Sequence, residues 1–171
     1  MKLKFLNLRN LIPVIITGLI LSSCNKDSTP SNDLVGTWTM KTTTFSVMIG
    51  NKTFTQYLID ELGLTAAEAQ TYNTLLITAL QQTYTGTIII KPDNTYTATM
   101  GGETDTGTWS LSSDSKKLTI DSSTDDPITF DVIDLTSSLL HLQAKESETD
   151  DLNGDDVPET LTITIDLTFS K

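Results

Sequence analysis

The feature that most constrains the fold of this chain is a two-residue alternation of apolar and polar side chains, which begins near residue 34 and recurs to the end. It is clearest in the last segment, where every second residue is apolar and threonine or aspartate stands between: Leu161, Ile163, Ile165, Leu167 and Phe169. Successive side chains of a β-strand point to opposite faces, so this segment predicts a strand with one face in an apolar core and the other in water.

About nine strands of this kind are predicted, separated by turns every eight to twelve residues or so. They cover residues 34–40, 43–49, 86–91, 96–100, 104–111, 117–121, 128–135, 139–145 and 161–169. Short turns between neighbours favour an antiparallel meander, which closes into an up-and-down barrel or folds into a sandwich. Ile133 and Leu135 have the opposite parity to Val132, which indicates either a β-bulge or a strand buried on both sides.

Residues 54–83 break the alternation and predict a helical insertion after the second strand. Residues 54–62 fit one short helix, which Gly63 ends. Thr65 and Glu68 have the spacing of a capping box, which starts a second helix that ends near Thr83. We expect one apolar face on this helix, which packs onto the sheet or lies as a lid across its open end. The predicted face comprises Ala69, Tyr72, Leu76, Ala79 and Leu80.

The N-terminal segment has the pattern of an export signal. Lys2, Lys4 and Arg9 precede an apolar run over residues 11–21, which is shorter than the roughly 20 residues that a membrane-spanning helix needs. A charged start, a short apolar run and small residues after it are typical of a secretory signal peptide.

Leu21-Ser22-Ser23-Cys24 closes that run and contains the only cysteine of the chain. It resembles the lipobox of bacterial lipoproteins, which implies cleavage between Ser23 and Cys24, a diacylglycerol on the Cys24 sulfur and an acyl group such as palmitate on the new amine. Two such chains suffice for stable membrane attachment. The alternative is a plain signal peptide with a chance cysteine. We therefore expect a signal peptide over 1–23, a flexible tether over 24–33 and one β domain over 34–171.

The charge of the exported part argues against a nucleic-acid partner. The whole chain has 11 basic and 22 acidic side chains, and removal of Lys2, Lys4 and Arg9 leaves eight against 22, a net charge of −14 without any arginine. Phosphate binding and base recognition depend on lysine and above all on arginine. Such a surface favours cations instead.

Several short motifs resemble those of the lipocalin-like lipoproteins of Bacteroidetes. They are Gly36-Thr37-Trp38, residues 94–97, residues 107–111, which include Trp109, and residues 117–120. The resemblance implies a barrel that binds a small hydrophobic ligand, with Trp38 and Trp109 as candidate contacts; packing in the core is the alternative role for both. In lipocalins an arginine closes the barrel base over the first-strand tryptophan. With no arginine after the leader, the base of this barrel has to close differently.

An acidic loop before the last strand predicts a weak calcium site. Asp151, Asn153, Asp155, Val157 and Glu159 stand at positions one, three, five, seven and nine of a calcium-loop pattern. Asp156 replaces the glycine of the sixth position, and Thr162 replaces the distal glutamate. The alternative is a solvated hairpin loop that binds no ion.

The remaining side chains favour a protein without catalytic activity. His141 is the only histidine, no serine lies in a Gly-X-Ser-X-Gly elbow, and lipid occupies Cys24. Carboxylates such as Asp131 and Asp134 leave an acid-base enzyme as the alternative. The sequence thus predicts a lipid-anchored protein of the bacterial outer membrane that binds a small hydrophobic ligand or another envelope component, with a purely structural role as a further alternative.

Overall fold

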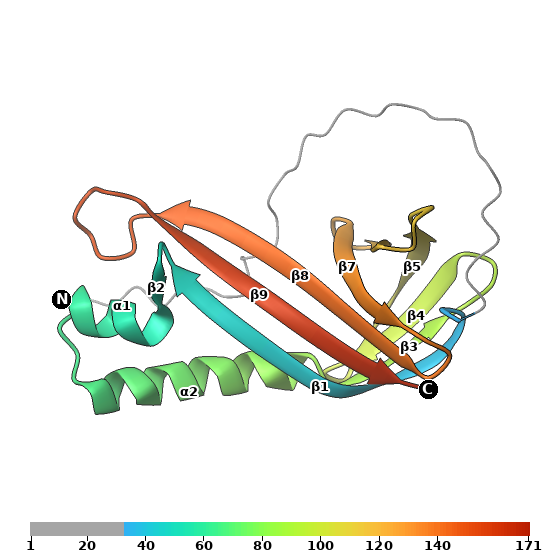
Figure 1. Cartoon of the computed structure of the whole chain (residues 1–171), viewed down its shortest axis with the longest axis horizontal. Helices are drawn as coiled ribbons and strands as arrows, with labels where there is room; N and C mark the ends of the chain where they lie inside the picture. The colour runs from blue at the N-terminus through green and yellow to red at the C-terminus, as the bar shows by residue number, and fades with distance from the viewer. Residues whose placement is uncertain (1–32) are drawn as a thin grey trace.

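The computed structural model describes residues 33–171 of the chain (Figure 1). The predicted signal peptide, Cys24 and the predicted tether up to residue 32 lie outside the described residues.

The described residues form one nine-stranded antiparallel sheet and two helices. The elements are β1 (Gly36–Ile49), β2 (Lys52–Thr53), α1 (Phe54–Asp60), α2 (Ala66–Thr83), β3 (Gly86–Ile90), β4 (Thr95–Met100), β5 (Glu103–Leu111), β6 (Lys117–Ser122), β7 (Ile128–Leu135), β8 (Leu139–Asp150) and β9 (Glu159–Ser170).

All strands except β2 close into an up-and-down barrel. Consecutive strands pair from β3 to β9, and β1 pairs with both ends of this series. Residues 36–39 of β1 lie against β3, while Thr39 and Met40 already pair with the end of β9. Closure leaves no free edge within the barrel. The mainly β prediction is confirmed, and of its two alternatives the structure is the barrel.

The first two predicted strands are a single strand. β1 has 14 residues and is interrupted only by a register shift between Met40 and Thr42, where a bulge lets the strand bend and continue. The apolar alternation changes parity at this bulge, from Trp38 and Met40 to Phe45 and Val47. Of the two alternatives for the parity change near Ile133, the structure has the bulge: the β7–β8 register shifts between Val132 and Asp134, and the Ile133 side chain is exposed.

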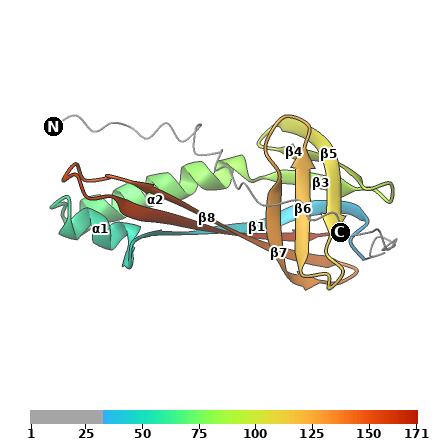
Figure 2. The ribbon, with the colours of Figure 1, turned by 90° about the horizontal axis from the view of Figure 1, so that it is seen from above.

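Strands β1, β8 and β9 are longer than the rest of the barrel and continue beyond it as a three-stranded sheet. We call this part the arm: residues 43–49 of β1, 144–150 of β8 and 159–166 of β9 (Figure 1). Seen from above, β4 to β7 run across the long direction of the arm (Figure 2). On its inner face, Phe45 pairs with Ile165, Val47 with Ile163 and Ile49 with Leu161. This apolar face has to be covered, and the two helices lie along it.

Local signals fix both helices. The Thr53 hydroxyl accepts the backbone N–H of Gln56 at the start of α1, and Gly63, with φ +68°, follows its end. Thr65 and Glu68 form the predicted capping box, and α2 ends at Thr83 as predicted. α2 packs against β1 and α1, so it lies on the sheet and is not a lid across the barrel end.

The face predicted for α2 is wrong at two positions. Tyr72 and Ala79 are exposed, whereas Ala69 is fully buried and Leu76, Ile77 and Leu80 are partly buried. Position 73, an asparagine, lies on the packed side instead of Tyr72. The predicted face was shifted around the helix axis because only apolar residues were chosen for it. The position of a residue along the helix, and not its type, decides whether it meets the sheet.

Candidate functional site

The two ends of the barrel hold different turns and chain segments. One end holds the β3–β4, β5–β6 and β7–β8 turns and the C-terminus; we call it the Lys171 end. The other holds the β4–β5 and β6–β7 turns, and the arm leaves from it; we call it the arm end. The side chains buried most completely, with exposed fractions below 2%, include Trp38, Tyr96, Leu118 and Leu140.

Trp38 and Trp109 both lie in this core. Their side chains are 0% and 4% exposed, and each indole N–H is satisfied: Trp38 Nε1 donates to the Leu34 carbonyl at 2.7 Å and Trp109 Nε1 to the Lys91 carbonyl at 3.0 Å. Buried tryptophans with a paired N–H fill volume without a polar cost. A ligand would reach either ring only from inside the barrel.

Lys171 closes the barrel base, the role that the sequence left without a candidate. Its Nζ lies 4.5 Å from the centroid of the Trp38 ring and donates to the Asp33 carbonyl at 2.5 Å. Gly36 makes room for this side chain, since a Cβ there would lie 2.8 Å from Lys171 Cε. The only signal in the sequence was a cation placed two residues after Phe169.

At the arm end the inward-facing side chains are only partly buried. The strand registers put these residues in line with the core positions of their own strands: Ala98, Met100, Ile120 and Ile128. We call this set the arm-end lining. Eight-stranded barrels are just wide enough to be filled by side chains or to hold one small ligand. Here side chains fill the centre of the barrel, and the apolar side chains towards the arm are only partly buried, as are Leu111, Val132 and Leu135 at the Lys171 end.

Two carboxylates of β5 share the face of this lining: Glu103, which pairs with Met100 and is exposed at the rim, and Asp105. Asp105 pairs with Ala98 across the β4–β5 register and therefore shares its face. Its two oxygens accept hydrogen bonds from the Tyr96 hydroxyl and, at 2.8 Å, from the Ser122 hydroxyl. Burial, followed by this bond to Asp105, raises the pKa of the Tyr96 phenol, so the phenol stays a donor at neutral pH.

The inner face of the arm continues the apolar surface beyond the lining. Phe45 and Tyr84 form an edge-to-face pair with ring centroids 5.5 Å apart, and both pack against the barrel core. Glu146 pairs with Ile163 and so points to the same face. Desolvation raises the pKa of the Glu146 carboxyl, although its side chain keeps contact with water.

The predicted calcium loop lies between β8 and β9 at the tip of the arm. The Asp151 carboxylate accepts the backbone N–H groups of Gly154, Asp155 and Asp156 at 2.7 to 3.1 Å, and Asp155 accepts that of Val157 at 2.8 Å. Within residues 33–171 no group of three or more His, Cys, Asp or Glu side chains is arranged to hold a metal ion. Calcium binding here stays a prediction.

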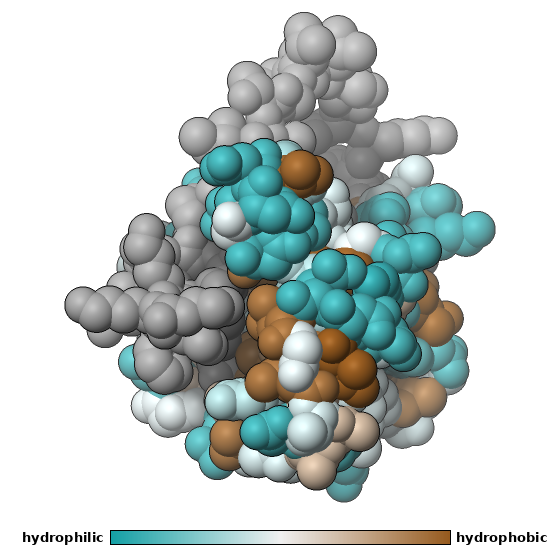
Figure 3. Space-filling model, turned by 90° about the vertical axis from the view of Figure 1, so that its left-hand side faces the viewer, coloured by the Kyte–Doolittle hydropathy of each residue, from teal (hydrophilic) through white to brown (hydrophobic). Residues whose placement is uncertain are grey.

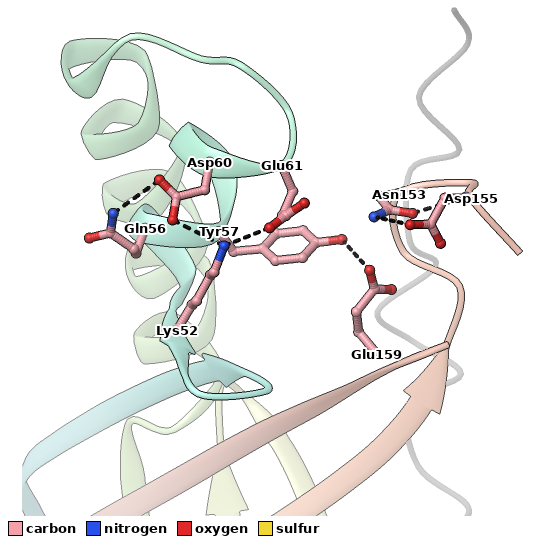
Figure 4. A network of polar contacts seen from close by, with 8 residues as sticks. All are labelled: Lys52, Gln56, Tyr57, Asp60, Glu61, Asn153, Asp155 and Glu159. Atoms are coloured by element: carbon pink, nitrogen blue, oxygen red, sulfur yellow. Dashed lines mark hydrogen bonds and ion pairs between the residues drawn. The ribbon is translucent and has the colours of Figure 1, made fainter. Parts of the chain in front are cut away.

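Glu159, the ninth position of that loop, is used to hold α1. It accepts the Leu152 N–H at 2.9 Å with one oxygen and the Tyr57 hydroxyl at 3.2 Å with the other (Figure 4). Tyr57 is buried, and its pKa is raised by that burial and then by the negative charge of Glu159. Sequence reasoning missed this contact because it joins positions 102 residues apart.

The base of α1 carries a small ionic network. Lys52 Nζ lies 3.0 Å from an Asp60 oxygen and 2.5 Å from a Glu61 oxygen, and Gln56 also donates to Asp60 (Figure 4). Hydrogen bonds from Lys52 and Gln56 lower the pKa of the Asp60 carboxyl. Figure 3 views the molecule from this end and shows apolar surface bordered by hydrophilic atoms. Leu62 and Leu64, in the segment between α1 and α2, are partly exposed.

The other candidates for chemistry are occupied by structural contacts. His141 Nε2 lies 3.2 Å from an Asp166 oxygen that also accepts the Gln143 amide. Asp131 forms an ion pair with Lys117 on the outside of the barrel. Asp134 is exposed just after the β7 bulge.

No protein-family model, curated protein or solved structure matches this chain. None of the helices in residues 33–171 is both long and apolar enough to pass through a membrane.

Proposed function

We propose that this chain is a lipid-anchored outer-membrane protein of Bacteroidetes type, and that its lipocalin-like barrel binds a small hydrophobic ligand and catalyses no reaction. The anchor is supported by the charged leader, the short apolar run and the Leu21-Ser22-Ser23-Cys24 motif. Two acyl chains at Cys24 supply stable attachment without a spanning helix.

The observation that carries the binding function is the arm-end lining. Side chains that face the interior of a barrel are expected to be buried, yet Ala98, Met100, Ile120 and Ile128 keep part of their surface exposed at this end. Ligand sites are typically apolar and concave with a few polar groups among them. Asp105, Tyr96 and Ser122 supply such polar groups at this position.

A second candidate function, contact with another envelope component, is favoured by the outward side of α2. Tyr72 is 47% exposed and Leu75 is 62% exposed on this helix. Apolar side chains that gather on one exposed surface are typical of protein contacts.

Native mass spectrometry of the mature, acylated chain extracted from its own host tests the ligand-binding function. We expect a complex heavier than the acylated chain by the mass of one small molecule, which gentle activation releases. A chain that carries its acyl groups and no other mass, in preparations from several growth conditions, would contradict ligand binding. Co-purification of a stoichiometric protein would favour the contact function instead.

A further inference from the structure

We propose that the arm end of the barrel selects apolar ligands that carry a protonated amine, with Asp105 as the group that binds the cation. This inference rests on the proposed ligand-binding function and adds the chemical class of the ligand. It also assigns to Asp105 a role that the fold alone does not require.

The first step is the position of Asp105. Its register partner Ala98 belongs to the arm-end lining, and Tyr96, whose hydroxyl it accepts, is 1% exposed in the core. The carboxylate thus lies on the inner wall of the barrel, next to apolar side chains. A carboxylate on such a wall is unfavourable unless hydrogen bonds or an opposite charge compensate it.

The second step is that the Asp105 carboxylate has no positively charged partner in the described chain. Its partners in the described chain are two neutral hydroxyls, on Tyr96 and Ser122, and it forms no ion pair within residues 33–171. Two hydroxyl donors leave further lone-pair positions on the two oxygens. Those positions accept the N–H groups of an ammonium ion, and the bonds they form are strengthened by charge.

The third step is that no lysine of the described chain supplies this charge. Four lysines stand at the opposite end of the barrel: Lys91, Lys116, Lys117 and Lys171. Lys52 forms ion pairs with Asp60 and Glu61. Lys145 pairs with Thr164 on the outer face of the arm, and Lys41 is exposed beside the β1 bulge. The inner surface near the arm end is therefore acidic without internal neutralisation.

A further acid, on the inner face of the arm, points the same way. Glu146 faces inward on the arm, near Tyr84, and has no ion pair in the described chain. Phe45 and Tyr84 lie on the apolar surface of the arm and pack against the barrel core. An alkyl group packed on the lining would keep an ammonium group at Asp105, while Glu146 and the net charge of the chain attract the cation.

The test compares three ligands with the same alkyl chain: octylammonium, octanol and octanoate. Each displaces a neutral fluorescent probe, N-phenyl-1-naphthylamine, from the full chain carrying Cys24→Ala at neutral pH and below micelle concentrations. We expect half-displacement by octylammonium at a concentration about tenfold below that of octanol, the size of effect that one charge-assisted hydrogen bond gives. Octanoate should be the weakest of the three.

Variants assign the preference to one residue. In Asp105→Asn, half-displacement of the probe by octylammonium should need the same concentration as half-displacement by octanol. Asp121→Asn is the matched control, because it removes the same charge from an exposed position on the outer face of β6. Where Asp105→Asn does not fold, as judged from the melting curve, Asp105→Ser replaces it. Asp105→Ser also removes the carboxylate and should abolish the preference for octylammonium in the same way.

The outcomes separate this inference from the proposed function. Two results overturn the assignment of the cation site to Asp105 but leave an apolar site in place. One is equal displacement of the probe by octanol and octylammonium on the chain with Asp105 intact. The other is a preference for octylammonium that survives in folded Asp105→Asn. If Asp121→Asn loses the preference for octylammonium to the same extent as Asp105→Asn, the overall charge of the chain attracts the cation. That result also overturns the assignment to Asp105. Failure of all three ligands and of the probe to bind contradicts the proposed function itself.

Discussion

The closure of the barrel base by Lys171 gives the sharpest prediction for stability. Lys171→Ala removes the ammonium group above the Trp38 ring and its hydrogen bond to the Asp33 carbonyl. A cation over an aromatic ring contributes about 0.5–1 kcal/mol at exposed sites and up to about 2 kcal/mol when desolvated. Lys171 is exposed while Trp38 is fully buried, so we expect a loss of about 1–2 kcal/mol with the hydrogen bond included.

Thermal unfolding followed by circular dichroism measures this loss. A domain of this size loses about 2–4 °C in Tm for each kcal/mol, so Lys171→Ala should melt roughly 2–8 °C below the unchanged chain. Lys171→Arg keeps a cation over the ring and should recover most of the difference. Lys116→Ala, in an exposed turn at the same end of the barrel, is the control for loss of a lysine charge.

Two results would refute the reasoning about the base. One is a Tm for Lys171→Ala equal to that of Lys116→Ala, which would mean that the contact with Trp38 contributes nothing. The other is a Gly36→Ala variant as stable as the unchanged chain, because a Cβ at that position has to displace the Lys171 stem and the backbone φ there is +147°.

Three further predictions follow from the leader, the α1 network and the arm tip. Cys24→Ala should block acylation and normal processing, seen as loss of labelled palmitate from a chain whose barrel still melts cooperatively; an acylated variant contradicts the anchor. The pKa of Asp60 is lowered in the folded chain, so the pairing of Asp60 with Lys52 stabilises the protein at neutral pH, and this stabilisation is lost as the pH falls through that pKa. Lys52→Met removes the pairing and should therefore narrow the difference between the Tm at pH 7 and the Tm at pH 3. An unchanged difference in Tm contradicts a stabilising role for this ion pair. Millimolar calcium should raise Tm, and Asp155→Ala should abolish the rise; no shift with calcium rules the site out.

Much of the fold could be predicted from the sequence because its signals are local. The period-two alternation located the strands, and Thr65 with Glu68 marked the start of α2, since a capping box depends on residues three positions apart. The same locality explains the error on α2. Tyr72 reads as a core residue by type, yet the helix turns it to solvent and places Asn73 on the packed side.

The parts that could not be predicted all depend on contacts between distant segments. No short-range sequence pattern indicates that β1, β8 and β9 extend beyond the barrel, or that Glu159 accepts a hydrogen bond from Tyr57 on α1. Asp105 was one acid among many in the sequence. Only the β4–β5 register puts it on the inner wall, beside Tyr96 and Ser122.

The most direct test of the ligand-binding account compares two neighbouring positions on β4. Ala98 points into the arm end of the barrel and Thr99 points outward from the next position. Affinity for N-phenyl-1-naphthylamine is measured by fluorescence titration for Ala98→Phe and Thr99→Phe, with the melting curve of each as the control for folding. The account predicts that Ala98→Phe fills the site and weakens binding at least tenfold or so, while Thr99→Phe leaves it unchanged. Equal affinity in two folded variants would contradict a ligand site inside the barrel.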